Sequence, residues 1–395
     1  MAMTGLTPAL SAPAGPGVRT VTDAVRRAAP ALLAFACVRL LSLVVLAVWS
    51  RAAGSSPHQL LSARWDSLWY ARVAEHGYGY TLDLGGGRVH SDLAFFPLLP
   101  WLERSLAACS PLSAADAGLL VSALSSLFAA WALFLVGERV YGRRAGIALA
   151  ALWAALPVSV VQSMAYSESL FTALAAWGVY AVLSGRWVWA GCCALLAGAT
   201  RPVGAAVVAA VWVAAAVALA SGGRWRTAWR AERRMLLGVA LAPLGWLAYV
   251  VWVGAREGEA LGYLRVQGGW GNGFDGGLAF ASFVGGRLAS PGGALAGAGL
   301  LAGVVLVLWL YARGVRQGQP LPLLVYAGVV LLLALTAKGY FGSKPRLMLP
   351  AFPLVLPLAV ALARLRTRWA AAVLGAVALA SALYGAFWLN GTGPP

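Results

Sequence analysis

Long apolar stretches alternate with short polar or basic connections along this chain of 395 residues. About 20 apolar residues are enough for one helix to cross the hydrocarbon core of a bilayer. Eleven stretches approach that length, and we expect each to be a transmembrane helix. They are 31–50, 113–137, 145–163, 168–184, 187–200, 203–220, 235–254, 294–312, 320–337, 347–363 and 369–389.

The region 187–220 is short for two crossings, but it is basic at both ends, so the chain must return to the side from which it started. Composition agrees with many crossings, since the chain is 61% hydrophobic and only 11% charged, with a mean hydropathy of +0.77. One soluble core cannot bury so much apolar surface. We therefore expect an all-α polytopic membrane protein of about 11 helices.

The basic residues lie in a pattern that sets an orientation. If the amino terminus is cytoplasmic, the inner segments hold 17 of the 30 Lys and Arg residues and only three of the 13 acidic residues. This asymmetry follows the positive-inside rule and explains the net charge of +17 without nucleic acid. The inner segments are residues 1–29, 138–144, 185–186, 221–234, 313–319 and 364–368.

Residues 1–29 are expected to be a loose cytoplasmic tail, followed by one membrane domain over 30–390 and a short outer tail over 391–395. No Ala-x-Ala cleavage pattern follows the first span, which we interpret as an uncleaved anchor. The two long connections, 51–112 and 255–293, both face outward, so extramembrane chemistry is expected on the outer side. No Walker-type or dinucleotide-binding motif is found.

The first outer loop contains the string RWDSLWYARVAEHGY, residues 64–78. Residues 65–76 are predicted to form an amphipathic helix at the membrane interface, with Trp65, Trp69 and Tyr70 as aromatic anchors. Anchoring alone is one interpretation, but it does not explain Asp66 between the tryptophans. A partly desolvated aspartate suits a base that takes a proton from a hydroxyl group.

Other polar clusters are expected on the same outer side: residues 166–168, Arg201, residues 338–340 and residues 344–346. Charged groups inside a membrane are costly and usually paired, so each is a functional candidate. A purely structural salt bridge between Glu168 and Arg201 is the alternative. Next to Arg346, the tenth span carries three prolines, which predict either a kink beside a lipid-side opening or a simple bend: Pro350, Pro353 and Pro357.

Five strings together resemble a known family: RWDSLWYARVAEHGY, AFFPLLPWL from residue 94, YSESLF from 166, TRPVG from 200 and KPRLMLPAFPL from 344. They are similar to the PIG-V-type mannosyltransferases, relatives of glycosylphosphatidylinositol mannosyltransferase II in the GT-C superfamily. The first string with its following FFPLxP is the most specific, and the strings cover residues 64–354. The Ala-, Arg- and Gly-rich composition indicates a bacterial member in the plasma membrane.

The resemblance implies a GT-C-like bundle that takes mannose from a polyprenyl-phosphate-mannose donor on the outer face, with Asp66 as the essential acid. We expect an inverting single displacement in which Asp66 accepts the acceptor's proton and cations stabilise the leaving phosphate. Arg346 is the preferred phosphate ligand because its guanidinium can bind in a fork. Lys344 and Arg201 are the other donor-phosphate candidates, and the substrate-binding candidates are Arg64, Trp65, Trp69, Tyr70, Glu75, His76 and Glu168.

No cofactor is expected. A divalent metal is optional for this chemistry, and Asp66, Asp92 and His90 are the residues that would contribute to a site. The four cysteines have no metal-ligand spacing and are interpreted as packing residues. A transporter or lipid flippase is the alternative function, and an envelope scaffold is a third, although no internal repeat is evident. The acceptor, whether a glycolipid, glycan or protein, is not specified by the sequence.

Overall fold

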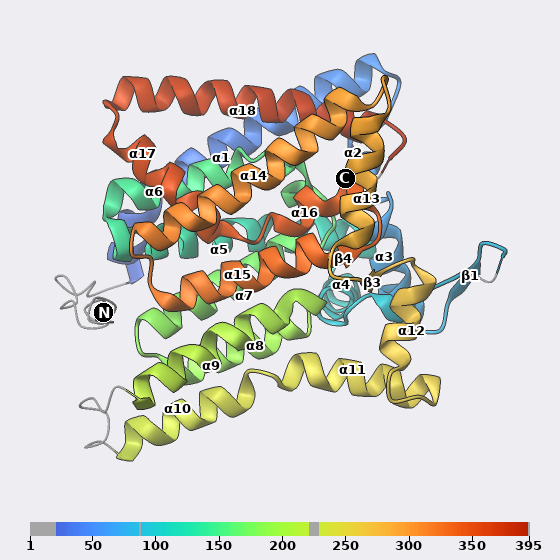
Figure 1. Cartoon of the computed structure of the whole chain (residues 1–395), viewed down its shortest axis with the longest axis horizontal. Coiled ribbons are helices and arrows are strands. Elements are labelled where there is room, and N and C mark those ends of the chain that lie inside the picture. The colour runs from blue at the N-terminus through green and yellow to red at the C-terminus, as the bar shows by residue number, and fades with distance from the viewer. Residues whose placement is uncertain (1–20, 87, 221–228, 394–395) are drawn as a thin grey trace.

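The computed structural model describes residues 21–86, 88–220 and 229–393. It is an all-α bundle whose long helices run roughly parallel to its longest axis (Figure 1). Alanine dominates the main core, and small side chains let helices approach closely in a membrane bundle. Gly191 shows this well, because a Cβ there would collide with the backbone of Gly238 on a neighbouring helix.

Six helices in the described part of the chain are long and apolar enough to cross a membrane, and a bent pair raises the number to seven. In that pair, Phe341–Met348 and Phe352–Arg364 meet at 77°, so the kink predicted from the prolines of the tenth span is confirmed. The six are Thr22–Ala52, Ala114–Tyr141, Pro202–Ala220, Glu232–Glu257, Ala294–Arg316 and Thr367–Asn390.

Among the described residues, at most seven of the eleven expected crossings correspond to helices of full spanning length. Four of the expected spans are represented by shorter helices, and a helix of 12 residues measures only about 18 Å against a hydrocarbon core of about 30 Å. Pro157 and Pro202 explain two of the shortenings, because each follows a helix that it cannot continue. The four are α6 (Arg143–Ala154), α7 (Glu168–Leu183), α8 (Trp187–Gly198) and α15 (Leu321–Thr336).

The expected amino-terminal tail is also shorter than predicted within the described residues. Helix α1 (Val21–Ala52) already includes the stretch 21–29, and Ala28 and Ala31 are fully buried in the main core. Packing therefore extends the helix beyond the apolar span. Residues 1–20, part of the connection 221–234 and residues 394–395 lie outside the described residues.

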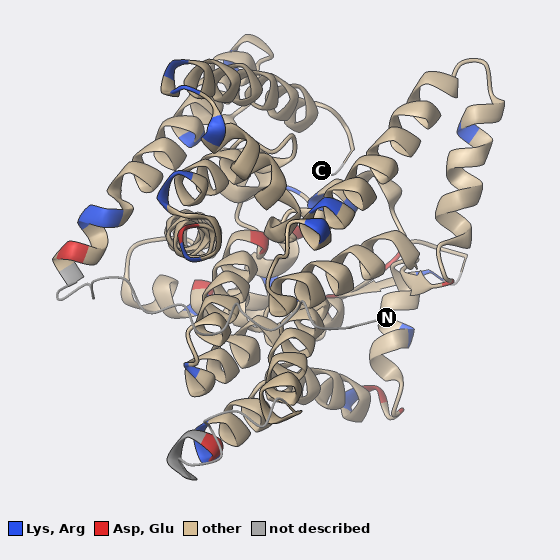
Figure 2. Ribbon diagram, turned by 60° about the vertical axis from the view of Figure 1, so that its left-hand side comes forward, with Lys and Arg blue, Asp and Glu red and all other residues tan. Residues whose placement is uncertain are grey.

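The two ends of the bundle differ. The connections α5–α6, α7–α8, α14–α15 and α17–α18 lie at the left end of Figure 1, and both long loops lie at the right end. Lys and Arg occur mainly near helix ends and in connections, leaving the helix middles largely uncharged (Figure 2). The remaining helices of the bundle are α5 (Ala114–Tyr141), α9 (Ala205–Ala220), α10 (Trp229–Leu241), α11 (Leu244–Glu257), α14 (Ala294–Arg316), α17 (Leu356–Arg364) and α18 (Thr367–Asn390).

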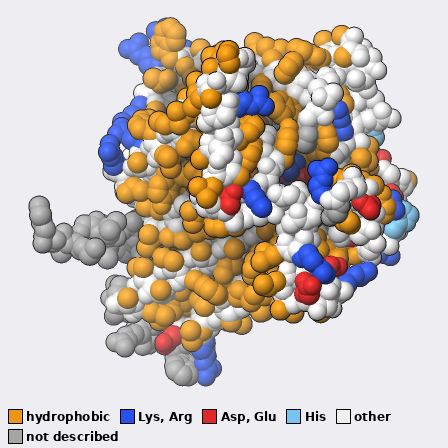
Figure 3. All heavy atoms as spheres, turned by 45° about the vertical axis from the view of Figure 1, so that its right-hand side comes forward, with side chains coloured by type: hydrophobic (Ala, Val, Ile, Leu, Met, Phe, Trp, Pro, Cys, Tyr) orange, Lys and Arg blue, Asp and Glu red, His pale blue; other side chains and the backbone are white. Residues whose placement is uncertain are grey.

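The long loops form a compact cap at the right end, where histidine and charged side chains gather beside the apolar surface (Figure 3). The helix predicted over 65–76 is present as α3 (Asp66–His76), and a further helix of the first outer loop, for which no range was predicted, is α4 (Leu98–Cys109). A hairpin pairs β1 (Thr81–Asp83) with β2 (Val89–Ser91), with Leu82 opposite His90. The other cap elements are α2 (Pro57–Ser62), α12 (Gly262–Gly269), β3 (Gly273–Phe274), α13 (Leu278–Ala289), β4 (Ala337–Lys338) and α16 (Lys344–Met348).

Candidate active site

Asp66 stands at the first position of α3, where the helix dipole favours a carboxylate. The preceding residue, Trp65, has a φ of 52°, a conformation that bulky residues rarely adopt. The N–H of Asp66 donates a hydrogen bond of 3.3 Å to the phenol of Tyr166. A strained turn and a buried tyrosine thus set the position of this carboxylate.

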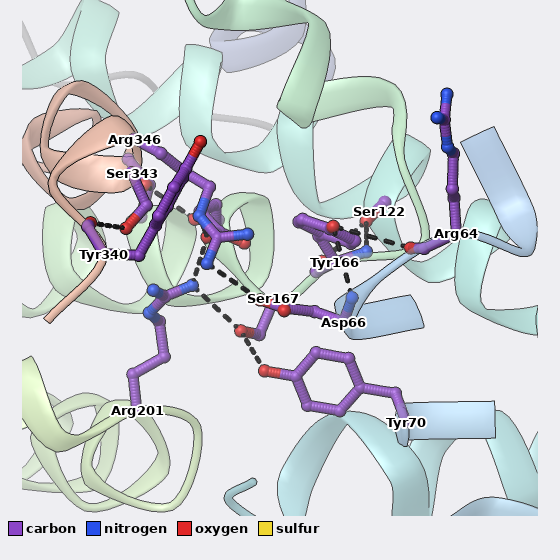
Figure 4. Close-up of polar contacts among 12 residues, drawn as sticks. Arg64, Asp66, Tyr70, Ser122, Tyr166, Ser167, Arg201, Tyr340, Ser343 and Arg346 are labelled. Carbon is purple, nitrogen blue, oxygen red and sulfur yellow. Dashed lines mark hydrogen bonds and ion pairs between the residues drawn. The ribbon is translucent and has the colours of Figure 1, made fainter. Parts of the chain in front are cut away.

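Asp66 faces a group of charged residues from three distant segments (Figure 4). Arg346 Nη2, on α16, lies 2.8 Å from Asp66 Oδ2, and Arg346 Nε lies 3.3 Å from Glu168 Oε1. Arg201 Nη1 lies 2.5 Å from the same Glu168 oxygen. Glu168 is 1% exposed, against 25% for the Asp66 side chain, so Asp66 is the accessible member. We call Asp66, Glu168, Arg201 and Arg346 the charged cluster.

Two further residues connect the charged cluster to α3. Ser167 Oγ lies 2.8 Å from the phenol oxygen of Tyr70 and accepts a hydrogen bond of 3.1 Å from Arg201. The guanidinium of Arg346 lies over the ring of Tyr166, 5.1 Å from its centroid. Burial raises the pKa of Tyr70, so its phenol stays protonated and serves as a hydrogen-bonding group.

The cluster pairs two cations with two anions. Glu168 is held between both guanidinium groups, which fixes them side by side. Arg346 Nη1 is buried and has no hydrogen-bond partner among the described residues. A buried donor without a partner is costly, and phosphate oxygens are well suited to satisfy a guanidinium. The arrangement can therefore bind an anionic group next to a partly exposed carboxylate.

Lys344 lies on the same short helix as Arg346 but has different partners. Its ammonium donates hydrogen bonds of 2.5 Å and 2.8 Å to the carbonyls of Ala334 and Ala337. It also lies 4.6 Å from the ring centroid of Phe280. Lys344 thus holds the end of α15 against α13, and the structure does not bring it into the charged cluster.

The side chains of the string RWDSLWYARVAEHGY, residues 64–78, lie in several different environments. Arg64 turns its side chain away from the cluster in Figure 4 and donates to the carbonyls of Leu389 and Gly391 at the end of α18. Trp65 packs against an apolar cluster that includes Leu46 and Tyr166. Of the substrate-binding candidates in this string, only Tyr70 is connected to the charged cluster by the contacts described above.

Trp69 and the far end of α3 lie elsewhere in the cap. Trp69 stacks on Phe95 at 5.6 Å and meets Trp270 edge-on at 4.9 Å. Glu75 and His76 are exposed at the last turn of α3, nine and ten residues after Asp66, with 3.7 Å between His76 Nε2 and Glu75 Oε2. The structure does not bring these two residues to the cluster.

The other residues named for a metal are also engaged elsewhere. Asp92 is fully buried and accepts backbone N–H groups of Gly79 and Tyr80, and burial raises the pKa of its carboxyl. His90 stacks on Trp270 with centroids 3.9 Å apart. Within the residues described, no three His, Cys, Asp or Glu side chains are grouped to hold a metal ion. The four cysteines are free thiols.

The sequence analysis included Ser167 within the polar cluster 166–168 without a role of its own, and it did not single out Glu103. Glu103 is fully buried on α4, and both carboxyl oxygens have no hydrogen-bond partner among the described residues. Desolvation, and then the charge of Glu75, raise the pKa of Glu103 well above the usual value. Nothing in the sequence of α4 distinguishes this acid from a solvent-exposed one.

Comparison with solved structures identifies the fold. ArnT from Cupriavidus metallidurans bound to undecaprenyl phosphate has a TM-score of 0.51 and 18% identity, covering 85% of this chain and 62% of that chain. Apo ArnT has a TM-score of 0.50 and 18% identity, and the match covers 85% of this chain and 61% of that chain. The apo oligosaccharyltransferase of Archaeoglobus fulgidus has a TM-score of 0.47 and 15% identity, and the match covers 91% of this chain and 55% of that chain.

The two ArnT comparisons show that the chain shares the fold of ArnT. The chain spans less than two thirds of the length of the solved proteins, 62% for ArnT with its lipid. No protein-family model matches the sequence, and no curated protein matches it either. The similarity to PIG-V-type enzymes stays a prediction from the sequence strings.

Proposed function

We propose that this protein is a membrane glycosyltransferase that moves mannose from a polyprenyl-phosphate-mannose donor to an acceptor hydroxyl. The observation that carries the proposal is the 2.8 Å pair of Asp66 and Arg346 at the cap end of a GT-C-like bundle. One group is a base and the other a phosphate ligand, and they come from segments 280 residues apart. The fold match to ArnT, solved with undecaprenyl phosphate, supports a lipid-phosphate donor.

The orientation supports the same proposal. The arginine-rich connections and the charged cluster lie toward opposite ends of the bundle. With the basic end in the cytoplasm, Asp66 faces the outer side of the bacterial plasma membrane. If the four shorter helices also cross the membrane, the chain crosses it eleven times, and the basic connections stay on the side opposite to the charged cluster.

In the proposed reaction, Asp66 takes the proton of the acceptor hydroxyl while its oxygen attacks the anomeric carbon. The bond between that carbon and the phosphate oxygen breaks, and its electrons leave with polyprenyl phosphate. The single displacement inverts the anomeric centre. Asp66 is well placed for this role because it is the most accessible carboxylate in the charged cluster.

Arg346 places the proposed phosphate ligand directly beside the proposed base, since its Nη2 lies 2.8 Å from Asp66 Oδ2. Negative charge on the phosphate grows as the sugar leaves, so Arg346 and Arg201 stabilise the transition state more than the ground state.

Glu168 acts in this proposal as the spacer of the two guanidinium groups. Its single contact oxygen pairs with both Arg201 and Arg346, which holds two phosphate ligands on one side of Asp66. The structural salt bridge considered from the sequence is thus present, and it belongs to the cluster that we assign to donor binding. The acceptor is a glycolipid, glycan or protein hydroxyl.

The test is sugar transfer by membranes that contain the protein. Radiolabelled polyprenyl-phosphate-mannose should label a native acceptor, and Asp66→Asn at equal expression should not. Asp83→Asn is the matched control, because Asp83 is an exposed aspartate of the same loop. Unlabelled polyprenyl-phosphate-glucose and polyprenyl-phosphate-pentose are added as competitors, and weak competition by both would support mannose as the sugar that is transferred. Transfer that is unchanged in Asp66→Asn would remove the base assignment, and absence of transfer from every donor would remove the proposed function.

A further inference from the structure

A buried cation lies outside the charged cluster, in the middle of α1. Arg39 is 6% exposed, and it is the only charged residue between Arg27 and Arg51. It lies 13 residues before the end of the helix at Ala52, a distance of about 20 Å along the axis. Burial of a charged arginine side chain this far inside a membrane helix costs free energy, so Arg39 is a functional candidate.

The partners of Arg39 are neutral hydroxyl groups. Its Nη1 donates to Ser159 Oγ at 3.0 Å, and its Nη2 donates to Ser163 Oγ at 2.5 Å. Within the described residues, no carboxylate forms an ion pair with it. Hydroxyl groups satisfy its N–H donors but do not neutralise its charge. Stability alone therefore does not account for an arginine here, because a well-packed apolar side chain would avoid the desolvation cost.

Both serines belong to one irregular segment, residues 155–167, which we call the bridging segment. It follows the end of α6 and leads directly into Glu168 at the start of α7. Its helical structure is limited to a short 3-10 turn over Ser159–Ser163. Its internal backbone hydrogen bonds are all short-range, such as the 3.2 Å bond from the N–H of Val161 to the carbonyl of Val158, so contacts with neighbouring elements are needed to fix where the segment lies.

Arg39 of α1 contacts the bridging segment from one side, and Ser381 of α18 also contacts it. Ser159 Oγ lies 3.2 Å from Ser381 Oγ, and Ser381 donates a 2.6 Å hydrogen bond to the carbonyl of Leu156. At its far end, the bridging segment carries Tyr166, which contacts the N–H of Asp66. The same rigid connection thus runs from α1 to the residues around the proposed base.

We propose that Arg39 is a positioning residue: by fixing Ser159 and Ser163 it sets the place of Tyr166 and Glu168 beside Asp66 and Arg346. It touches none of the reacting groups. The inference rests on the proposed function for its catalytic consequence, but the ordering of the bridging segment is independent of any reaction. A displacement of about 1 Å in an active-site group is sufficient to slow an enzyme about 100-fold.

The experiment compares Arg39→Leu with Arg51→Leu, which removes the same charge from an exposed position at the end of the same helix. Three properties are measured on the purified full chain: sugar transfer, thermal unfolding, and hydrogen exchange by mass spectrometry. For Arg39→Leu we expect about 100-fold lower kcat with little change in the donor KM, an unchanged or higher Tm, and faster exchange confined to residues 155–168. Arg51→Leu should match the wild type in all three.

The conservative variant Arg39→Lys provides a further test. One ammonium cannot reproduce the two-armed contact of a guanidinium, so activity and protection of the bridging segment should both be intermediate. A parallel loss of Tm, activity and chain-wide protection in Arg39→Leu would show a merely structural role and overturn the proposal. A raised donor KM with unchanged kcat would show direct donor binding and also overturn it.

These outcomes stay separate from failure of the proposed function. If the wild type transfers no sugar from any donor, the proposed function is lost, and hydrogen exchange still decides whether Arg39 orders the bridging segment. If transfer is found but exchange over residues 155–168 is the same in Arg39→Leu and the wild type, the positioning inference is lost and the proposed function stands.

Discussion

Two carboxyl groups of the first long loop have opposite environments. Asp66 begins α3, keeps 25% of its side chain exposed and pairs with Arg346 at 2.8 Å. Glu103, on the adjacent α4, is fully buried, and its two oxygens lack hydrogen-bond partners among the described residues. Of the two, only the Asp66 carboxylate combines access to the surface with a cationic neighbour that can bind a substrate anion, and on this ground we assign the proposed proton transfer to Asp66.

The two sites also differ in what their surroundings permit. A phosphate can approach Arg346 next to Asp66, whereas the Glu103 carboxyl lies against Gly118 and forms no ion pair among the described residues. We therefore assign chemistry to the Asp66 region and structural packing to the Glu103 region.

Asp66→Asn should lower kcat for sugar transfer by about 10² to 10⁴, the usual contribution of a positioned general base. The amide keeps the size of the side chain but cannot take the proton. Tm should change little, because the side chain is partly exposed. Transfer kinetics and thermal unfolding of the purified variant check both statements. A kcat within about twofold of the wild type, the effect expected for the surface variant Asp83→Asn, would contradict the assignment.

Arg346→Lys should lower transfer by about 100-fold, because one ammonium replaces a guanidinium that binds in a fork. The total charge is unchanged, so a loss reports geometry. Initial rates at saturating and limiting donor separate donor binding from the chemical step. Arg287→Lys, an exposed position in the cap, is the control and should behave like the wild type. Equal rates for both variants would show that Arg346 is not a phosphate ligand.

Glu103→Gln should change the pH dependence of stability and leave transfer nearly unaffected. Burial raises the pKa of Glu103, so the neutral form is the one that folding favours. Its contribution to stability is complete below the ordinary glutamate pKa and is lost as pH rises through the raised pKa of the folded state. Relative to Glu103→Gln, wild-type Tm should fall with rising pH in this window. Parallel Tm curves would mean that Glu103 is not buried as a neutral acid.

The double variant Glu75→Gln and His76→Asn should have the smallest effect, within about twofold on transfer. Both side chains are more than half exposed, and their 3.7 Å pair lies at the opposite end of α3 from Asp66. Transfer rates at several donor and acceptor concentrations check this. A strong rise in KM would return these residues to the substrate-binding role expected from the sequence.

Much of the site geometry was accessible from the sequence. The orientation of the spans placed Glu168, Arg201 and Arg346 on the side of Asp66, and the structure brings these four together. The helix over 65–76 followed from its composition, and the kink followed from the prolines. These features depend on span length, parity and local residue type, which a single sequence contains.

The rest depends on tertiary packing. Lys344 and Arg346 are two residues apart, and only their contacts with α15 and α3 show that they have different partners. The burial of Glu103 depends on the notch at Gly118, which no local pattern reveals. Helices such as α8 end early because of their neighbours in space and the next proline. Span counting by hydropathy therefore overestimates the number of full-length helices.

The most direct test of the account is a stoichiometry measurement in proteoliposomes. Purified protein is given a polyprenyl-phosphate-mannose donor with separate labels on the sugar and the lipid, together with membrane extract as acceptor. We predict one polyprenyl phosphate released for each sugar transferred, with both products lost in Asp66→Asn. Donor that crosses the bilayer with its sugar still attached, or equal product formation by Asp66→Asn, would contradict the account.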